Sequence, residues 1–491
     1  MTAIKYLIYL SALYCGSIHA NVNSYFNQIN KDPNALYAFF KTMPKGGELH
    51  YHLAGGAYPE SLLEMATTGD YCIDKHTFAA AKSSLTCAGV KSNEIIQHPD
   101  FYAAIIKSWS LKDFKAGSES AFDHFFNSFN KYITLVTDYS PQALTSVINR
   151  AAEQKENYLE VMILPDNGNS LQFAPSIANI NSFNAKKDNL LENRAFQTNI
   201  NTAALAPERI LKQTQEELKC TNRPFSPACN IKVRFQTYVL REQNLDGVFA
   251  QTLTAFEIAS RSKGLVVGVN LVQRENEALS LRDYRVQMEI FNYFHALYPN
   301  VNIALHAGEL APESVPPEAL GYHIHDAVFT GHAKRIGHGV DIAYENNQKS
   351  TLNYMAKHQI PVEINLISNK QILGISGHQH PLNYYIAHNV PVTLSTDDEG
   401  ILRTDLTRQY VEAVLAHGLD YSTLKQINRN ALTYAFLPGK SIWAEPIKAK
   451  LIDECQDINS SSCLEFIQGD EKARLQWQLE RQLLEFESGF D

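Results

Sequence analysis

The stretch that decides the fold runs from residue 265 to residue 306. It begins with the apolar run LVVGVNL (265–271), continues with RDYRVQMEIFNYFHAL (282–297) and ends with NIALH (302–306). The first and last segments are short and apolar, as buried strands are, whereas the middle segment has the length and apolar spacing of a helix. This order predicts two parallel strands joined by a crossover helix.

The same alternation recurs along most of the chain, with Val248–Ser262 as another helical pattern. Strands that alternate with helices form parallel sheets, and eight candidate strands are present. The sequence therefore predicts an α/β fold of the (β/α)8 TIM-barrel type rather than an open doubly wound sheet. The candidate strands are Gly47–Leu53, Tyr158–Leu164, Ile231–Leu240, Leu265–Leu271, Asn302–His306, Arg335–His338, Val362–Asn365 and Pro391–Ser395.

Several segments do not follow the alternation. Three of them contain a cysteine pair, and the first two of these are expected to be insertions over the barrel, where loops commonly set substrate specificity. The predicted organisation is a signal segment (1–20), an N-terminal helical arm (21–42), the barrel (43–438) with insertions at about 66–110 and 166–230, and a C-terminal helical appendage (439–491).

The composition excludes some classes of function. The chain has 491 residues, 45% of them hydrophobic and 19% charged, so it can bury a substantial core. Its formal net charge is -9 and no basic block is present, which argues against nucleic acid as a partner.

The first residues have the order of an export signal. Lys5 precedes the apolar run Tyr6–Ile18, and a small residue, Ala20, stands at the expected cleavage point. The apolar run is short for a bilayer span, so no stable membrane anchor is expected. The predicted location of the mature protein is periplasmic or extracellular.

The cysteines agree with export. Seven are present, and six remain when Cys15 is removed with the signal segment. A metal cluster is the rival interpretation, but no pair has CxxC spacing or lies beside paired histidines. An even set in sequence-local pairs predicts disulfides in an oxidising compartment. The candidate pairs are Cys72 with Cys87, Cys220 with Cys229, and Cys455 with Cys463.

Polar residues that carry chemistry gather in four short segments at strand ends. In the first, His50 and His52 are two residues apart and project to the same side of a strand. His306 ends a second strand, His338 lies between glycines after a third, and the adjacent carboxylates Asp397 and Asp398 follow a fourth. Because strand ends meet at one face of a barrel, these side chains can share a site. Imidazoles together with a carboxylate suit a divalent metal ion, and zinc is the metal expected first.

The four segments resemble motifs of the adenosine deaminase family of metal-dependent amidohydrolases. They read PKGGELHYHL (44–53), LHAGE (305–309), RIGHG (335–339) and STDD (395–398), and their order and rough spacing agree from Met43 to Leu437. The exported character, the early cysteine-containing insertion and the Trp109-Ser110 segment resemble the secreted adenosine-deaminase-related growth factor branch.

The resemblance implies a role for each motif residue. One Zn²⁺ per chain would be bound by His50, His52, His306 and Asp397. Glu309 would protonate purine N1, while His338 and Asp398 would flank the attacking water. Zinc lowers the pKa of a bound water to about 7, so a zinc-bound hydroxide could attack C6. The implied reaction is hydrolytic deamination of adenosine or 2'-deoxyadenosine to inosine or 2'-deoxyinosine and ammonia.

The substrate-recognition residues depart from the family pattern. Ala54 stands where the family commonly has an acid that contacts the sugar, and Gln273 stands where it has a glycine that approaches the purine. Gln273 and the small Gly308 are therefore candidate substrate-binding residues. Trp109 is a third candidate, which could stack on the substrate or be a buried structural residue. The expected partner remains a small purine nucleoside.

Two alternatives stay open. One is a deaminase of another aminopurine, or another single-metal amidohydrolase, because the zinc and acid–base residues are intact while the recognition residues are altered. The other is a secreted binding or growth-factor-like protein, which would have no reason to retain Glu309, His338 and Asp398 together. The aromatic and apolar residues of the N-terminal arm could form a packing arm or a homodimer contact.

Overall fold

The computed structural model describes residues 21–83 and 87–490, so the predicted signal segment lies outside the described residues. Eight parallel strands form a nearly closed barrel in chain order, β1-β5-β6-β7-β8-β9-β10-β11. The last strand returns to the first through a parallel bridge between Tyr51 and Asp397. The strands are β1 (Glu48–His52), β5 (Tyr158–Ile163), β6 (Lys232–Leu240), β7 (Val266–Val272), β8 (Asn302–Ala307), β9 (Arg335–His338), β10 (Val362–Ile364) and β11 (Val392–Leu394).

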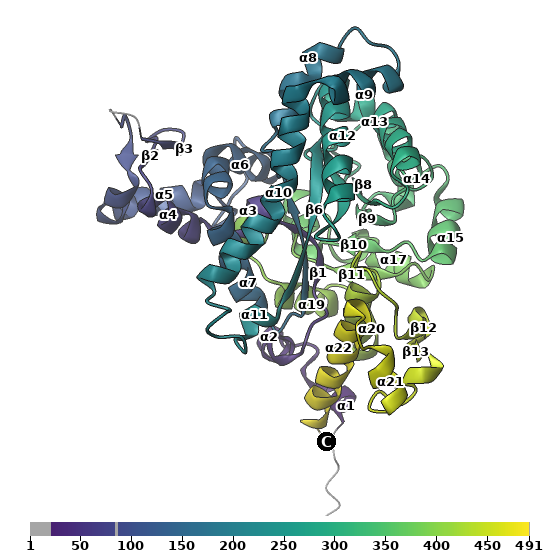
Figure 1. Cartoon of the computed structure of the whole chain (residues 1–491). Coiled ribbons are helices and arrows are strands. Elements are labelled where there is room, and N and C mark those ends of the chain that lie inside the picture. Colours follow the sequence, from purple (N-terminus) through teal and green to yellow (C-terminus); the bar gives the residue numbers. More distant parts are fainter. Residues whose placement is uncertain (1–20, 84–86, 491) are drawn as a thin grey trace, which may run out of the picture.

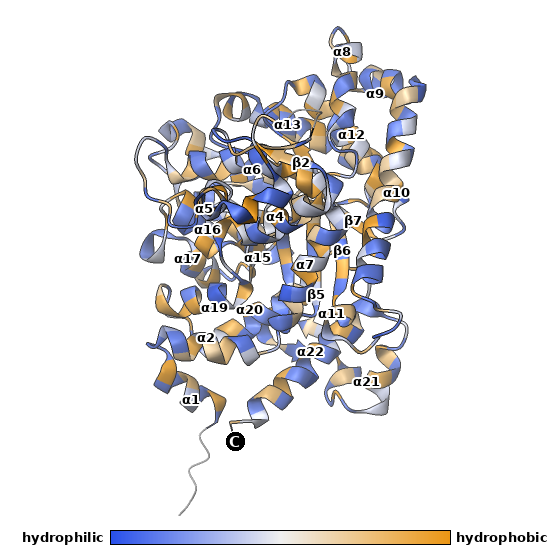
Figure 2. Cartoon of the chain, turned by 90° about the vertical axis from the view of Figure 1, so that its left-hand side faces the viewer, coloured by the Kyte–Doolittle hydropathy of each residue, from blue (hydrophilic) through white to orange (hydrophobic). Residues whose placement is uncertain are grey.

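This architecture confirms the predicted (β/α)8 TIM barrel, in which each candidate strand is found within one or two residues of its expected bounds. Helices surround the strands (Figure 1), and the outer helices carry both hydrophilic and hydrophobic residues (Figure 2). The helices that follow β6 and its successors are α12 (Leu245–Arg261), α13 (Ala278–Leu297), α14 (His323–Phe329), α15 (Gln348–His358), α16 (Leu366–Ile372), α17 (Leu382–Ala387), α18 (Glu399–Leu402), α19 (Leu406–Leu415) and α20 (Tyr421–Thr433).

The two longest connections lie at the start of the barrel. The segment between β1 and β5 projects to the left in Figure 1 and includes a small antiparallel sheet in the order β3-β2-β4. It contains α3 (Leu53–Gly56), α4 (Pro59–Thr68), β2 (Tyr71–Ile73), β3 (Ala80–Lys82), β4 (Val90–Lys91), α5 (Pro99–Ser108), α6 (Ala121–Asp138) and α7 (Ser140–Glu153). The segment between β5 and β6 contains α8 (Ala174–Ile177), α9 (Phe183–Glu192), α10 (Arg194–Glu217) and α11 (Pro227–Asn230).

The two ends of the described chain meet beneath the barrel (Figure 1). Phe26 and Phe39 of the N-terminal helices are buried against Tyr421 of α20, and Phe39 also contacts Phe486 of the last helix. The arm thus packs within its own chain. These elements are α1 (Val22–Ile29), α2 (Pro33–Thr42), β12 (Trp443–Glu445), β13 (Lys450–Leu451), α21 (Ser461–Phe466) and α22 (Glu471–Ser488).

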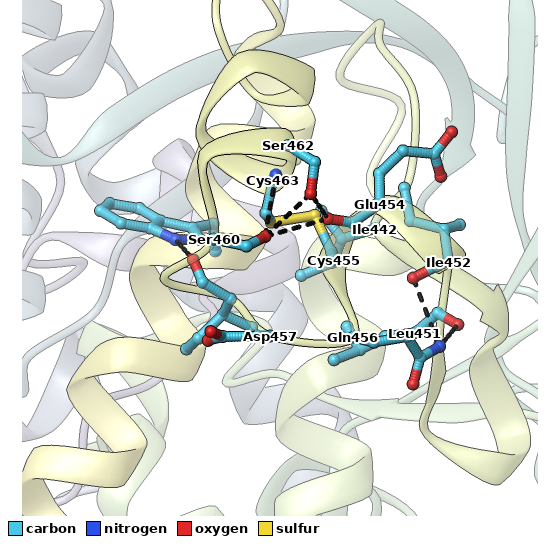
Figure 3. The surroundings of a disulfide bond; sticks show 12 residues. Ile442, Leu451, Ile452, Glu454, Cys455, Gln456, Asp457, Ser460, Ser462 and Cys463 are labelled. Atoms are coloured by element: carbon cyan, nitrogen blue, oxygen red, sulfur yellow. Dashed lines mark hydrogen bonds between the residues drawn. A yellow bond between two sulfur atoms is a disulfide. The ribbon is translucent and has the colours of Figure 1, made fainter.

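The three predicted cysteine pairs are bonded as disulfides. Their Cα–Cα distances are 5.6 Å for Cys72–Cys87, 5.5 Å for Cys220–Cys229 and 4.5 Å for Cys455–Cys463. Figure 3 shows the third, beside which the Ser460 and Ser462 hydroxyls donate to the Glu454 carbonyl. No helix in the described part of the chain is long and apolar enough to cross a membrane.

Removing the third disulfide is expected to destabilise the appendage without affecting the barrel's site. Cys455 and Cys463 are buried in a small apolar cluster separate from the barrel core, and their bond closes a short loop. The double substitution Cys455→Ser/Cys463→Ser should lower the free energy of unfolding of this region by about 2–3 kcal/mol. Urea denaturation followed by tryptophan fluorescence measures it, since Trp443 and Trp477 pack in this cluster. Equal stability of variant and parent under non-reducing conditions would contradict the expectation.

Candidate functional site

Four side chains from three separate parts of the barrel converge at the carboxyl ends of its strands. His50 and His52 lie on β1, His306 lies on β8, and Asp397 follows β11. One ligand atom from each of these buried residues lies within 4.8 Å of the others. The Asp397 Oδ1 atom is 3.3 Å from Nε2 of both His50 and His52, and the His52 and His306 Nε2 atoms are 3.1 Å apart.

Hydrogen bonds on the far sides of two imidazoles set their tautomers. His50 Nδ1 lies 2.8 Å from Glu363 Oε2, and His306 Nδ1 lies 2.9 Å from Asn270 Oδ1. Both partners are oxygens that accept, so each Nδ1 carries the proton and each Nε2 presents a lone pair to the cluster. His50 Nε2 is buried without a hydrogen-bond partner.

This donor set fits a divalent cation. Because His306 presents an unprotonated Nε2, the His52 Nε2 atom 3.1 Å away either donates a proton to it or, when it is also unprotonated, shares a cation with it. Three imidazole nitrogens and one carboxylate are ligands that suit zinc and similar divalent metals. Asp397 has a φ of 66°, a left-handed backbone uncommon outside glycine, and its Oδ2 accepts a hydrogen bond of 2.7 Å from Ser368 Oγ. The turn and this bond hold its carboxylate toward the histidines.

A buried ion network supports His50 from inside the barrel. Arg335 donates to Glu363 Oε1 at 2.5 Å and to Glu160 Oε2 at 2.6 Å. Burial alone would raise the pKa of Glu363, but Arg335 and His50 lower it. The ionised carboxylate keeps the proton of His50 on Nδ1, which leaves Nε2 free as a ligand atom.

His338 lies beside this cluster and is buried, with 1% of its surface exposed. A histidine between two glycines is expected to be sterically open, but this one is packed like a core residue. The Asn369 amide nitrogen donates to His338 Nδ1 at 2.9 Å, and the Asn369 oxygen lies 3.0 Å from His380 Nε2. This closer amide donor favours the tautomer with the proton on Nε2, which lies 3.4 Å from the Asn365 amide nitrogen and 3.9 Å from Asp397 Oδ2. Burial lowers the pKa of His338 to about 3, so the imidazole is neutral.

Two carboxyl groups complete the site. Burial, Asp397 and Glu275 raise the pKa of Glu309 well above its usual range, which favours its neutral form. Burial and Asp397 likewise raise the pKa of Asp398, whose Oδ1 is buried without a hydrogen-bond partner. Gly55 makes room for Asp398, because a Cβ atom there would lie 2.0 Å from that oxygen.

A cavity of about 310 Å³ opens onto these groups. Phe125, Phe126 and Phe129 of α6 form one side, here called the aromatic wall. Both polar and apolar side chains line the other sides. A volume of this size is at the lower end for small-molecule sites. Its lining residues are His52, Ala54, Phe125, Phe126, Phe129, Asn130, Ile133, Leu164, Tyr238, Leu240, Glu242, Val272, Gln273, Arg274, His306, Glu309, His338, Asp397 and Asp398.

The three predicted substrate-binding residues have different surroundings. Gln273 lines the cavity. Gly308 is absent from the lining and packs against Asp341 and Ile324, where a Cβ atom would lie 2.3 Å from Asp341 Oδ1. Trp109 is also absent from the lining and fully buried, and its indole N–H donates to the Phe78 carbonyl at 2.8 Å. Its surroundings match the buried structural alternative.

Sequence reasoning missed the groups that orient the site. Glu363 and Asn369 have no motif of their own, and no role was predicted for Asn270, since each of the three acts on a histidine from another part of the sequence. The aromatic wall has a local signal, because Phe125, Phe126 and Phe129 have helical spacing on α6.

Comparisons with known proteins agree with this geometry. The adenosine deaminase family model matches residues 106–457. The adenosine deaminase of Klebsiella pneumoniae (strain 342) is 37% identical over 153 residues, which are 31% of this chain and 40% of that enzyme. The chain thus aligns with less than half the length of this relative. The adenosine deaminase of Edwardsiella ictaluri (strain 93-146) is 27% identical over 260 residues, 47% of this chain and 73% of that one.

Solved structures share the fold. Arabidopsis ADAL complexed with IMP has a TM-score of 0.55 at 18% identity, covering 91% of this chain and 99% of that one. The adenine deaminase from Arthrobacter aurescens has a TM-score of 0.52 at 15% identity, covering 80% and 94%. Because the family model matches well over half of its length, this chain belongs to the adenosine deaminase family.

Proposed function

We propose that this chain is a zinc-dependent aminohydrolase that converts adenosine or 2'-deoxyadenosine and water into inosine or 2'-deoxyinosine and ammonia. The observation that carries the proposal is the arrangement of Glu309, His338 and Asp398 around the cavity that also reaches His306 and Asp397. Candidate metal-ligand atoms, the neutral carboxyl of Glu309 and an unpartnered carboxyl oxygen of Asp398 lie together there, as attack of water on a purine ring requires.

One zinc ion would be held by His50, His52, His306 and Asp397. When bound, zinc lowers the pKa of a coordinated water to about 7 and so supplies a nucleophile at neutral pH.

Glu309 would protonate purine N1. Its raised pKa keeps the carboxyl neutral near pH 7, so it can give a proton to the ring nitrogen while C6 is attacked. The ring then accepts the electron pair displaced by the new C6–O bond. When the carbonyl of the product forms, the proton lost from the new hydroxyl replaces the one that Glu309 gave.

His338 and Asp398 would orient the attacking oxygen. His338 carries its proton on Nε2, because Asn369 donates to its Nδ1, so Nε2–H can donate to that oxygen. Asp398 Oδ1 has no other partner and can take a proton from the water. Burial and Asp397 raise its pKa, and the positive charge of a bound metal ion would favour its ionised form, in which it can hold that proton and pass it to the departing amino group.

A second candidate is deamination of a purine nucleotide or another enlarged aminopurine. A second cavity of about 360 Å³ adjoins the first and shares Ala54, Ile133, Leu164 and Tyr238 with it. Arg209 lines this second cavity and forms no ion pair within the described residues. A phosphate on the sugar could reach this arginine through the opening that the small Ala54 leaves.

Ammonia release by the purified, zinc-loaded protein tests both candidates. The substrates are adenosine, 2'-deoxyadenosine, adenine and AMP, each followed by a coupled ammonia assay. Release from the two nucleosides supports the first candidate, and release from AMP alone supports the second. No ammonia from any of the four, with one zinc bound per chain, would contradict both and leave another amidohydrolase reaction or the binding protein.

Gln273→Gly is expected to lower KM for adenosine several-fold without loss of kcat. Gln273 has a φ of 84°, a left-handed conformation that glycine adopts freely and glutamine adopts only at a cost, and its side chain forms part of the cavity wall. The variant loses the hydrogen bond of 3.0 Å from the Glu242 amide to Gln273 Oε1 but relieves backbone strain. Steady-state kinetics measure the effect, and an increased KM would show instead that the Gln273 side chain binds substrate.

We also propose that the mature protein is exported. Three disulfides within one chain support an oxidising compartment.

A further inference from the structure

Glu275 lies just beyond the end of β7 and is buried, with 2% of its surface exposed. Its carboxylate accepts hydrogen bonds from two peptide N–H groups of the turn formed by Gly308 and Glu309, here called the catalytic turn. Gly308 N donates to Oε1 at 3.0 Å, and Glu309 N donates to Oε2 at 2.8 Å. Each carboxylate oxygen thus binds one of two successive peptide groups, and the second belongs to the proposed proton donor itself.

Two further residues hold Glu275 in place. His323 Nδ1 lies 2.5 Å from its Oε1, and Arg241 Nη1 lies 3.6 Å from the same atom. Burial alone would raise the pKa of Glu275, but Arg241 and His323 lower it to about 2, so the group is ionised at neutral pH. Arg241 also donates to the His306 carbonyl at 2.8 Å. The network therefore holds the segment from His306 to Glu309 at both ends.

The carboxyl of Glu309 depends on this support. No hydrogen bond from its side chain to another described residue is present, and its nearest ion-pair partner is His338 Nδ1 at 3.6 Å. Gly308 has a φ of 72°, so the chain turns sharply just before Glu309. The direction of the Glu309 side chain is consequently set by the backbone of this turn, which Glu275 binds.

We propose that Glu275 is a positioning residue, which fixes the Gly308–Glu309 turn so that the Glu309 carboxyl faces N1 of the bound purine. The kinetic test of this proposal rests on the proposed function, whereas the crystallographic test of the Glu309 position does not. Glu275 also places a negative charge near Glu309, and this contributes with burial and Asp397 to the raised pKa of Glu309.

The test compares Glu275→Gln with a matched control, Asp166→Asn. Asp166 is also buried, and each of its carboxylate oxygens also accepts one peptide N–H group, from Gly168 at 3.0 Å and from Ser170 at 2.8 Å, but these groups lie in the segment after β5 and not on the Gly308–Glu309 turn. Zinc content, melting temperature, kcat and KM for the best purine substrate are measured for both zinc-loaded variants. Crystal structures show the position of the Glu309 carboxyl.

We expect Glu275→Gln to lower kcat by about 10- to 100-fold, because a displacement near 1 Å of a reacting group has an effect of this size. KM should stay within about threefold, one zinc should remain bound, and the Glu309 carboxyl should be displaced in the crystal. Asp166→Asn should lose stability while its kcat stays within about twofold of the parent. Glu275→Asp, which keeps the charge but shortens the side chain, should show the same loss of kcat if Glu275→Gln does not fold.

An unmoved Glu309 carboxyl in the Glu275 variants, with kcat within twofold of the parent, would overturn the proposal. Loss of zinc from these variants would also overturn it, because the effect would then arise at the metal ligands. If the parent protein releases no ammonia from any purine, the proposed function fails, and the crystal structures alone decide whether Glu275 positions Glu309.

Discussion

Replacing Glu309 with glutamine is expected to lower kcat for adenosine by about 10²- to 10⁴-fold, the usual contribution of a general acid. Glutamine has nearly the same shape and can still donate a hydrogen bond to N1, so KM should change by no more than about threefold. What the amide cannot do is transfer a proton to the ring. Attack at C6 moves the electron pair of the C6–N1 double bond onto N1. Without a proton from residue 309, N1 would become negatively charged, so the barrier to attack rises.

Steady-state ammonia release and the spectral change from adenosine to inosine both measure this effect. Glu318→Gln is a suitable control, because Glu318 is an exposed acid nearby in the sequence. The parent should also lose activity on the alkaline side, since the neutral form of Glu309 is present below its raised pKa and disappears as the pH rises through it. A Glu309→Gln variant with parental kcat would remove Glu309 from the mechanism.

Replacing His306 with alanine is expected to reduce activity by more than about 10³-fold, because the water would no longer be activated by a correctly held metal. His306 supplies one of the three histidine nitrogens of the candidate metal site, and Asn270 fixes its orientation. The effect of added zinc on the free energy of unfolding should report metal binding directly. Zinc at a free concentration of 100 Kd should raise the free energy of unfolding of the parent by about 2.7 kcal/mol and that of the variant by much less.

Zinc titration followed by calorimetric melting separates this expectation from general damage to the fold. His378→Ala provides the control, because His378 is an exposed histidine on a neighbouring loop outside the ligand set. The control should keep one zinc per chain, full activity and the zinc-dependent rise in melting temperature. A His306→Ala variant that binds zinc as tightly as the parent would show that the four-residue set is wrong.

The sequence by itself determined the barrel and the residues that meet at its face. A strand such as Leu265–Leu271 and a helix such as Arg282–Leu297 are recognised from side chains a few positions apart, so they can be identified without knowledge of the fold. Parallel strands all end at one face of a barrel, which makes residues as distant as His50 and Asp397 neighbours once the fold class is known. The sequence-local disulfides were predictable for the same reason, since Cys455 and Cys463 are only 8 residues apart.

Only the tertiary structure decided how those residues are oriented and charged. The proton on His50 is placed by Glu363, 313 residues away, and the tautomer of His338 is set by Asn369. Glu275 reaches the catalytic turn from the preceding strand, and no motif marks it. The physical reason is that hydrogen-bond direction and desolvation depend on atoms brought together from different strands. Local periodicity shows which face a residue occupies, but not which partner it finds there.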